Sequence, residues 1–533
     1  MSIHVASMNG GWKMGTYPMD PVDAAWYHID GPANPATVTG VALTTQPLDF
    51  DKVREVYRLR LGEFDRFHQR VVETGFPLAT PHWQDMPHFD IDQHLHRIAL
   101  PAPHDMATLR TLFTDIASMP LDHEQPLWQV HLVEDVAGGS ALIMRYHHCI
   151  GDGTAIQALV RKVFDPTPDA PLAGVPAEGE ASGTASPLAD VLFGFGTIER
   201  AAQRALALAR GTFDTIVHPQ QVLEKVGLVL GGAGVLLTEL VKQPDPESPF
   251  KGDFGIRKHV AWSAPVAIAD VKAIGAPSGA KVNDVLIAAM TGALREYLKS
   301  RGVNVNHTTL RAMVPVDLRP PERIGQLGND FGLVVLELPV ATAKAAQRLA
   351  ETKVRMDKLK RSPEPVAMKF LFDIFGRGPK AIQDLATSIF GSKASVVMTN
   401  VVGPKQPVYL AGVPIDQMMF WVPHPGRQLG MGISILSYRG MASLAVIADA
   451  GLVPDPETIT SAFNREFERM RRTVTAPAKK TAAKPTARAG LQTVRAKASQ
   501  GGEGRKVTAV KAASGAKLPR RRPSAKAGGA RAR

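Results

Sequence analysis

The residues of this sequence best suited to chemistry lie together at positions 147–153. His147 and His148 follow the apolar run ALIMRY, and Asp152 comes four residues after the second histidine. A histidine at the end of a buried strand has few degrees of freedom, and near neutrality its imidazole can accept a proton from a hydroxyl or a thiol. Gly151 and Gly153 permit a sharp turn and the close approach of a substrate. The segment therefore indicates a general base, with an aspartate that could face the substrate or brace the loop.

Three other interpretations of this segment compete with a general base. Neighbouring strand residues point to opposite faces, so His147 and His148 cannot readily bind one ion. The paired cysteines or spaced histidines of a zinc site are also missing from the sequence, so we expect no metal. Cys149 beside His148 could form a thiol–imidazole pair, but neighbours in sequence seldom have the geometry for it. The segment could also be an ordinary loop whose polar groups are satisfied.

Hydrophobic periodicity predicts the elements that position these residues. Residues 128–135 alternate like a strand, and 141–146 form a short apolar run typical of a buried strand. A helix opened by Gly153 and Thr154 is expected to follow over 154–164. An earlier helix, capped by Asp49 or Asp51, is expected from the helical spacing of four apolar residues, Val53, Val56, Tyr57 and Leu61.

The length of 533 residues favours two domains, and the chain is 44% hydrophobic. We expect an N-terminal α/β half over 1–165 and a second α/β half over 257–472, with a cleft between them. The second half contains apparent strands over 331–340, 394–403, 428–440 and 441–451 and helices over 282–302 and 458–474. Residues 166–256 are expected to be a Pro/Ala/Gly/Ser-rich linker followed by a helical connector.

The connector contains thirteen uncharged residues from Val226 to Thr238, whereas a membrane-spanning helix needs roughly 20 apolar residues. A packed or amphipathic helix is the simpler interpretation, and a helix that dips into a lipid surface is the alternative. The N-terminus has no basic start followed by an apolar core, so no secretory signal is expected. The single cysteine, Cys149, fits a reducing compartment.

The positive charge is concentrated in the C-terminal tail, residues 473–533. The tail has sixteen Lys or Arg and one acid, Glu503, which leaves 46 basic and 49 acidic residues in the rest of the chain. Its apolar residues are mostly alanine and it has no aromatic residue, so we expect it to be disordered. Such a tail could be a simple solvated extension, or it could bind anionic lipid or nucleic acid without sequence preference.

The HHCIGDG segment is HHxxxDG, and together with other motifs it resembles the bacterial wax ester synthase/diacylglycerol acyltransferase family. This family lies within the CoA-dependent acyltransferase superfamily, which includes chloramphenicol acetyltransferase. The supporting motifs occur in family order: PMDPVDAAWYHID, PLDHEQPLWQVHLVE, NDVLIAAMTGALREYL, RAMVPVDLRP, LGNDFG, MTNVVGP and LGMGISILSYRGMASLAVIADAGLVPDP. MTNVVGP departs from the family's SNVPGP by a threonine and a valine. The resemblance runs from about residue 17 to residue 470 and omits the linker and the tail.

The resemblance implies two chloramphenicol-acetyltransferase-like α/β subdomains with the active site at their interface. It implies transfer of a fatty acyl group from acyl-CoA, as substrate, to diacylglycerol or a long-chain alcohol, with no cofactor. By position, His148 would be the general base, His147 would shape the site, and Gly153 would keep the loop tight. Asp152 would be mainly structural, with Arg319 as its candidate partner. The enzyme would be cytoplasmic and peripherally attached to a membrane or lipid body.

The remaining motifs have simpler structural interpretations beside functional ones. Pro126, Leu127 and Trp128 could be a packed turn or a wall of the acyl pocket. Asn283 and Asp284 could cap a helix or orient the reaction intermediate. Three further residues, Asn400, Gly328 and Asn329, are interpreted as turn residues.

Two other functions remain open from the sequence. One is a superfamily acyltransferase that acts on a polyketide- or peptide-type acceptor. The other is a non-catalytic lipid-granule or nucleic-acid binding protein, against which the intact HHxxxDG argues.

Overall fold

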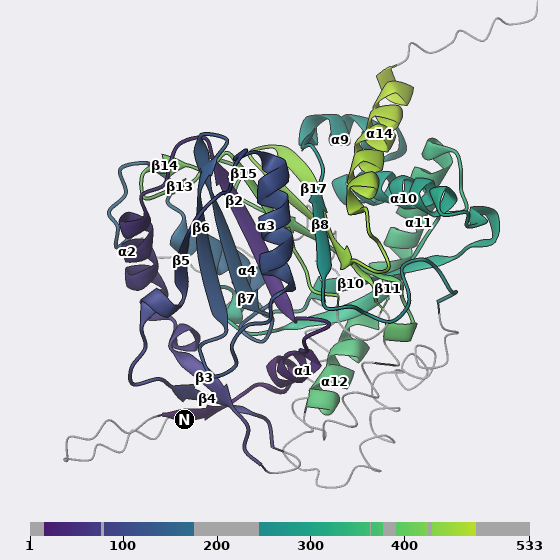
Figure 1. The fold of residues 1–533 in the computed structure, drawn as a ribbon. Helices are drawn as coiled ribbons and strands as arrows, with labels where there is room; N and C mark the ends of the chain where they lie inside the picture. Colours follow the sequence, from purple (N-terminus) through teal and green to yellow (C-terminus); the bar gives the residue numbers. More distant parts are fainter. Residues whose placement is uncertain are drawn as a thin grey trace, which may run out of the picture. The chain divides into compact units, whose positions relative to one another are not determined.

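The computed structural model describes residues 15–75, 79–174, 245–362, 364–376, 388, 391–424 and 429–475 (Figure 1). The chain divides into two compact units, Met1–Pro477 and Ala478–Arg533, and every described residue belongs to the first. The expected connector helix around 226–238 and the tail beyond Thr475 lie outside the described residues.

The N-terminal sheet has five strands in the order β15-β2-β7-β6-β5. Their bounds are β2 Thr37–Thr44, β5 Leu95–Ala99, β6 Trp128–Val136, β7 Gly139–His147 and β15 Gln417–Trp421. Only β5 and β6 pair in parallel, and the other pairs are antiparallel. A separate small sheet consists of β1 Thr16–Pro18, β4 His82–Asp85 and β3 Gln69–Val72.

The C-terminal sheet has seven strands, with the path β11-β10-β12-β16-β17-β8 and β9 also paired with β17. Their bounds are β8 Lys258–Trp262, β9 Val266–Ala267, β10 Leu310–Asp317, β11 Phe331–Leu338, β12 Val396–Val402, β16 Met431–Tyr438 and β17 Met441–Asp449. β12 pairs in parallel with both β10 and β16. A two-stranded ribbon, β13 Tyr409–Leu410 with β14 Val413–Pro414, precedes β15.

Nine described α-helices flank the sheets: α1 Pro21–Ile29, α2 Phe50–Arg60, α3 Met106–Ser118, α4 Gly153–Val163, α9 Ile268–Gly275, α10 Val282–Ser300, α11 Ala345–Leu359, α12 Glu364–Gly376 and α14 Pro456–Thr475. Short 3₁₀ turns lie at Leu61–Glu63, Asp65–Phe67, Ile91–Gln93, Ala276–Ser278, Val305–His307 and Pro321–Arg323. The helices α9, α10 and α14 gather beside the C-terminal sheet, and α3 lies beside β15 and β8 (Figure 1).

The two predicted halves each supply most strands of one sheet, but one strand of the C-terminal half joins the N-terminal sheet and the halves share a core. β15 comes from the C-terminal part of the chain and pairs with β2 of the N-terminal sheet. The indole of Trp421, at the end of β15, donates to Ala261 O at 3.3 Å and to Val446 O at 3.1 Å in the C-terminal sheet. One hydrophobic cluster combines N-terminal residues with Met313 and Phe331. A division at 165 and 257 therefore describes the sequence better than it describes the packing.

The described ends of the predicted 166–256 segment are anchored to the fold. Arg60 forms a buried ion pair with Asp165 at 2.9 Å and donates to Leu172 O at 2.8 Å. At the other end Phe250 is fully buried in the core of the C-terminal half. The tail boundary also moves, because α14 continues to Thr475, past residue 472 where the second half was expected to end.

Local sequence explains the two elements that carry the HHxxxDG segment. Every residue of β7 is buried, as expected for a central strand between β2 and β6 with a continuous apolar run. α4 begins at Gly153 and buries Ala155, Leu159 and Val163, which recur every four residues. The cap of α4 is Asp152 rather than a residue after it.

Candidate active site

The HHxxxDG segment is a tight turn that joins β7 to α4. The backbone N–H of His147 donates to Leu127 O at 2.9 Å, which continues the pairing of β7 with β6. The N–H of His148 donates to Ala36 O at 2.7 Å on the other side. The chain then turns, with Ile150 N donating to His147 O at 3.0 Å. Backbone hydrogen bonds to neighbouring segments thus fix the main chain of both histidines, independently of their side-chain contacts.

The half-buried side chain of His148 lies between an amide and an aromatic ring. Its Nδ1 is 3.1 Å from Oδ1 of Asn329, which is buried. Trp26 of α1 stacks on the imidazole with ring centroids 3.8 Å apart and planes 13° from parallel, and Phe331 lies 6.0 Å away. The ring therefore has one orientation, set by residues of α1 and of the segment before β11.

Burial also sets the protonation of His148. Desolvation lowers the pKa of His148 to about 4, and the nearby Asp152 carboxylate offsets this only in part. The imidazole is therefore neutral at physiological pH, which is the form that a general base requires.

Asp152 uses its two carboxylate oxygens for two different structural tasks. Oδ1 accepts from Thr154 N at 3.1 Å and from Ala155 N at 3.0 Å, which caps α4. Oδ2 lies 2.8 Å from an Arg319 guanidinium nitrogen and also accepts from Asp330 N at 2.8 Å. Arg319 and Asp152 are both buried, so the pairing expected for these two residues is present and shielded from water.

The segment Gly328–Asp330 joins this ion pair to His148. Gly328 N donates to Ile150 O at 2.9 Å, and Asp152 N donates to Gly328 O at 3.2 Å. A Cβ on Gly151 would lie 2.5 Å from Ala155 Cβ and 3.4 Å from Gly328 N, so a side chain does not fit there. A Cβ on Gly153 would lie 3.7 Å from Val401, which is an ordinary contact. The glycine that the close packing of this turn requires is therefore Gly151 rather than Gly153.

His147 points away from His148, toward Asp30 and His123. Its Nε2 is 3.7 Å from Asp30 Oδ1, and Asp30 Oδ2 is 3.0 Å from His123 Nε2. Burial alone would raise the pKa of the Asp30 carboxyl, but hydrogen bonding with His123 and the nearby His147 outweighs it and lowers that pKa below its usual value. Potential ligand atoms of these three residues lie within 4.8 Å of one another.

The hydrogen bonding of His147 argues against a metal at this cluster. Its Nδ1 accepts from Cys149 N at 3.1 Å, so the proton of the neutral ring sits on Nε2. A metal on Nε2 would force that proton onto Nδ1, where it would meet the Cys149 N–H. His147 therefore supports the turn through Nδ1, while its Nε2 lies near Asp30 without a hydrogen-bond partner in the described part of the chain.

Cys149 is fully buried in the N-terminal core, and burial raises the pKa of its thiol well above the usual value. A neutral thiol is a poor nucleophile, so Cys149→Ala should retain most of the turnover per folded molecule. Intact mass measurement during turnover checks this, because an acyl adduct on Cys149 would replace direct transfer with a thiol mechanism.

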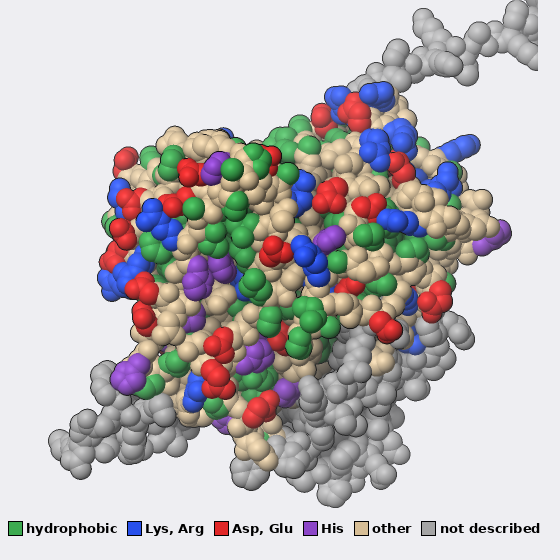
Figure 2. All heavy atoms as spheres, in the orientation of Figure 1, with side chains coloured by type: hydrophobic (Ala, Val, Ile, Leu, Met, Phe, Trp, Pro, Cys, Tyr) green, Lys and Arg blue, Asp and Glu red, His purple; other side chains and the backbone are tan. Residues whose placement is uncertain are grey.

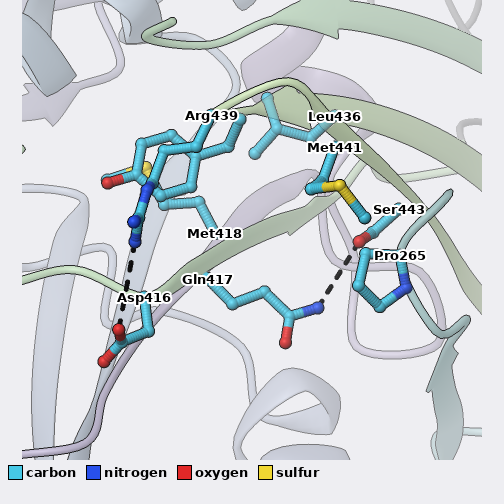
Figure 3. Close-up of a pocket in the computed structure, with 9 residues that line it drawn as sticks. Pro265, Asp416, Gln417, Met418, Leu436, Arg439, Met441 and Ser443 are labelled. Carbon is cyan, nitrogen blue, oxygen red and sulfur yellow. Dashed lines mark hydrogen bonds and ion pairs between the residues drawn. The ribbon is translucent and has the colours of Figure 1, made fainter. Parts of the chain in front are cut away.

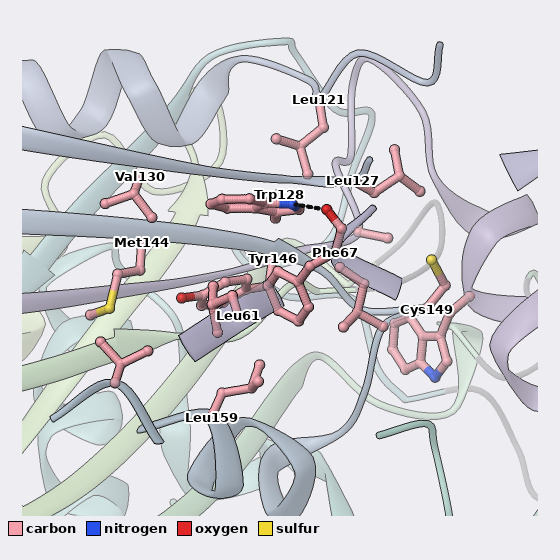
Figure 4. Packing of buried hydrophobic residues seen from close by; sticks show 14 of the residues in the cluster. Leu61, Phe67, Leu121, Leu127, Trp128, Val130, Met144, Tyr146, Cys149 and Leu159 are labelled. Atoms are coloured by element: carbon pink, nitrogen blue, oxygen red, sulfur yellow. Dashed lines mark hydrogen bonds between the residues drawn. The ribbon is translucent and has the colours of Figure 1, made fainter. Parts of the chain in front are cut away.

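The PLW residues Pro126, Leu127 and Trp128 are buried at the start of β6. Trp128 donates from its indole to Phe67 O at 3.0 Å and stacks on His94 at 4.6 Å, as part of the core in Figure 4. Leu127 contributes its carbonyl to the backbone of His147. The packed-turn interpretation fits these positions, since the side chains face the core.

Asn283 and Asp284 lie in the first turn of α10 and are buried. Asp284 Oδ2 accepts from Lys281 N at 2.8 Å, so it satisfies the backbone just before the helix. Asn283 Oδ1 accepts from the side-chain amide of Asn400 in β12. The helix-cap interpretation fits Asp284, while Asn283 ties α10 to the MTNVVGP segment.

A cavity of about 360 Å³ lies beside β15, β16 and β17 (Figure 3). Its lining includes apolar Met418, Leu436 and Met441, with Gln417 donating to Ser443 at 3.4 Å. None of the predicted site residues lines it. The cavity therefore has a lining that shares no residue with the contacts of His148.

Sequence reasoning missed four contributors to the site. They are Trp26, the contact of Asn329 with His148, Asp23, which accepts from Asn329, and Arg66, which pairs with Asp23 and donates to Ile150 O. Asn329 was interpreted as a turn residue, and Asp23 and Trp26 belong to PMDPVDAAWYHID without a predicted role. A useful signal was available, because an aspartate among apolar residues of a short helix suggests a buried partner.

Comparison with known proteins identifies related sequences and domains. Residues 19–286 match the wax ester synthase/diacylglycerol acyltransferase catalytic domain, and residues 327–471 match the WS/DGAT C-terminal domain. The chain is 28% identical over 413 residues to the probable diacylglycerol O-acyltransferase tgs1 of Mycobacterium tuberculosis, covering 74% of this chain and 82% of that protein. It is 27% identical over 459 residues to the putative diacylglycerol O-acyltransferase Rv1760 of the same species, covering 83% and 88%.

Solved structures show the same fold. The wax ester synthase/diacylglycerol acyltransferase of Marinobacter aquaeolei VT8 has a TM-score of 0.60 and 20% identity, over 86% of this chain and 99% of that one. The first condensation domain of the calcium-dependent antibiotic synthetase has a TM-score of 0.52 and 15% identity, over 87% and 97%. The catalytic-domain match alone spans half of the 533 residues, so this chain belongs to the wax ester synthase/diacylglycerol acyltransferase family.

Proposed function

We propose that this protein is an O-acyltransferase that moves a fatty acyl group from acyl-CoA to diacylglycerol or a long-chain alcohol. The products are triacylglycerol or wax ester, together with free CoA. The observation that carries the proposal is the placement of His148 of HHxxxDG, whose Nδ1 faces Asn329 and whose ring stacks on Trp26. The family membership and the relatives named as diacylglycerol O-acyltransferases support it.

In this mechanism His148 acts through Nε2. It takes the proton of the acceptor hydroxyl as the oxygen attacks the thioester carbonyl. The tetrahedral intermediate collapses, the C–S bond breaks, and the imidazolium returns the proton to the CoA thiolate. Asp152 and Arg319 hold the turn that carries His148. The Nδ1 of His147 accepts from Cys149 N in the same turn. The reaction forms no covalent acyl-enzyme and routes no step through a cofactor.

The surroundings of His148 suit this chemistry. Apolar Trp26 and Phe331 flank the ring, and the low local polarity that they create strengthens oriented hydrogen bonds to a developing oxyanion. Asn283, linked to Asn400, is the remaining candidate for orienting the intermediate. Structural support, rather than substrate contact, is the role proposed for Pro126, Leu127, Trp128 and Asp284. The contacts of Leu127, Trp128 and Asp284 are with the backbone and the core of the protein.

The test is an assay of the purified protein with palmitoyl-CoA. Thiol release is followed with hexadecanol and with a diacylglycerol as acceptors, and the lipid product is identified. Ester formation with either acceptor supports the proposal, and the ratio of the two rates gives the acceptor preference. Thiol release only with a peptide- or polyketide-type acceptor, or none with any acceptor, would contradict it.

We further propose peripheral attachment to a membrane or lipid-body surface through the basic tail. No helix in the described part of the chain is long and apolar enough to cross a membrane. On the face shown in Figure 2, acidic and basic side chains are interspersed, and outside the tail the two signs nearly balance. The sixteen basic residues from 473 onward are therefore the strongest source of attraction to anionic lipid, at about 1 kcal/mol for each residue near the surface.

Deleting Ala478–Arg533, which spares α14, should leave turnover on detergent-dispersed substrate nearly unchanged. It should weaken co-sedimentation with anionic liposomes, most clearly at low salt. Neutral liposomes are the control for charge, and competition with DNA shows whether the tail also binds nucleic acid. Equal binding to anionic liposomes with and without the tail would rule out the tether.

A further inference from the structure

We infer that Asn329, held by Asp23, is the positioning residue that keeps His148 in the tautomer needed for catalysis. The inference rests on the proposed function and names residues that the HHxxxDG motif does not contain. Asn329 lies 181 positions after His148, and Asp23 lies 306 positions before Asn329, so only the fold brings the three together.

The orientation of the Asn329 side chain is determined by its donors. Its Nδ2 donates to Asp23 Oδ1 at 2.8 Å and to His148 O at 2.8 Å. Both partners are acceptors only, so the amide nitrogen must face them. Asn329 Oδ1 is then left to face His148 Nδ1 at 3.1 Å.

This amide oxygen can only accept a hydrogen bond. The proton of the neutral imidazole is therefore drawn to Nδ1, and the lone pair is left on Nε2. The other tautomer would place two lone pairs against each other at 3.1 Å. The same amide contacts the Nδ1 of the ring and donates to the carbonyl of His148, so it sets the rotamer of the side chain as well as its tautomer.

Asp23 holds the Asn329 side chain from the side opposite His148. It is fully buried on α1, and its Oδ1 also accepts from Asn329 N at 2.9 Å. Its Oδ2 lies 2.8 Å from Arg66, which donates in turn to Ile150 O at 2.7 Å. Burial raises the pKa of Asp23 to about 6, and Arg66 opposes the rise. The turn is thus held between two carboxylate–arginine pairs, a partly exposed one through Asp23 and a buried one through Asp152.

The charged and titratable groups that act on His148 are few in the described residues. The Asp152 carboxylate raises the pKa of His148 and His147 lowers it. Asp23 contacts the nitrogen of the Asn329 amide rather than the imidazole. Trp26 and Phe331 contribute no charge. A charge introduced at Asn329 would therefore be the nearest to Nδ1.

The first measurement does not depend on activity. In ¹⁵N spectra of protein labelled at histidine imidazoles, the His148→Gln variant identifies the His148 signals. The parent should show His148 with the proton on Nδ1, and Asn329→Ala should show a mixture of tautomers. A proton on Nε2 in the parent, or an unchanged tautomer in Asn329→Ala, would overturn the inference even if the acyl-transfer assay fails.

The second measurement is kinetic. Asn329→Ala should lower kcat on the order of 10–100-fold, the range found when a group that orients a metal-ligating histidine is lost, with little change in KM for palmitoyl-CoA. Asn329→Asp is made together with Asp23→Asn, so that the new carboxylate does not face the Asp23 carboxylate 2.8 Å away. The double variant should move the acid limb of the kcat/KM–pH profile from about 4 toward neutrality, because a carboxylate beside Nδ1 favours the protonated ring. An unmoved limb in the folded double variant contradicts the assignment.

Asp23 and a matched control separate positioning from stability. Asp23→Asn should lower kcat in the parent but add little in the Asn329→Ala background, since its effect on the imidazole passes through Asn329. The loss of its pair with Arg66 should lower stability equally in both backgrounds. Asp165→Asn disrupts a buried aspartate–arginine pair with no described contact to His148, so it should lower stability without moving the pH profile. Additive losses from Asp23→Asn and Asn329→Ala, or a shifted profile in Asp165→Asn, would mean that the effect is only structural.

Discussion

His148→Ala will lower turnover by about 10²–10⁴-fold, which is the usual contribution of a positioned general base. The variant loses the Nε2 lone pair that accepts the proton of the acceptor hydroxyl. Its backbone N–H to Ala36 O and its carbonyl to Asn329 Nδ2 do not need the imidazole, so the turn should remain folded. Palmitoyl-CoA binding, measured by calorimetry, should survive while thiol release in the assay falls.

His424→Ala is the matched control for this experiment. His424 is also buried, and burial lowers its pKa to about 3, so it too is a neutral histidine at physiological pH. It packs edge-on against Phe254 and has no described contact with His148. Its loss should leave turnover per folded molecule near the parental value. Near-parental turnover in folded His148→Ala protein would remove His148 from the mechanism.

Asp152→Asn will lower stability and turnover together. The substitution keeps an oxygen that can cap α4 but removes the charge that faces Arg319. An unpaired charge in a buried position costs about 3–5 kcal/mol, so the midpoint of denaturant unfolding should fall clearly. Arg319→Met removes the other partner and should destabilise the fold in the same way.

Asp105→Asn is the control for the capping role of Asp152. Asp105 caps α3 by accepting from Thr108 N at 2.8 Å, and it has no arginine partner among the described contacts. It is exposed, so the same change should cost at most about 1 kcal/mol. If Asp152→Asn unfolds at the parental denaturant concentration and only turnover fails, Asp152 has a direct role in the chemistry.

Sequence reasoning succeeded where the signal was local. The apolar run before His147 became the fully buried β7, and the glycine-flanked Asp152 lies directly before α4. The spacing of Val53, Val56 and Tyr57 became the buried face of α2, capped by Asp49. Such patterns can be read from the sequence because strand and helix periodicities place near neighbours on one face. The pairing of Asp152 with Arg319 came from the family resemblance rather than from any local pattern.

Local patterns failed where a residue's function depends on a distant partner. The segment around Asn329 reads as an ordinary turn. Its contacts with His148 and Asp23 form only in the folded chain, where the segment before β11 lies against the end of β7 and against α1. Periodicity also cannot predict that β15, from the C-terminal part of the chain, joins the N-terminal sheet, since a strand's sequence does not say which sheet it joins.

Residue types and short spacings were enough to predict the position of the HHxxxDG segment between a buried strand and a helix, and to predict the family of the chain. Those depend on residue type and short spacing, which carry over unchanged into the folded protein. The tertiary structure decided which nitrogen of His148 faces Asn329, which glycine must lack a side chain, and that the PLW side chains face the core. Those depend on distances of a few ångström between segments hundreds of residues apart, and close packing of the whole chain sets them.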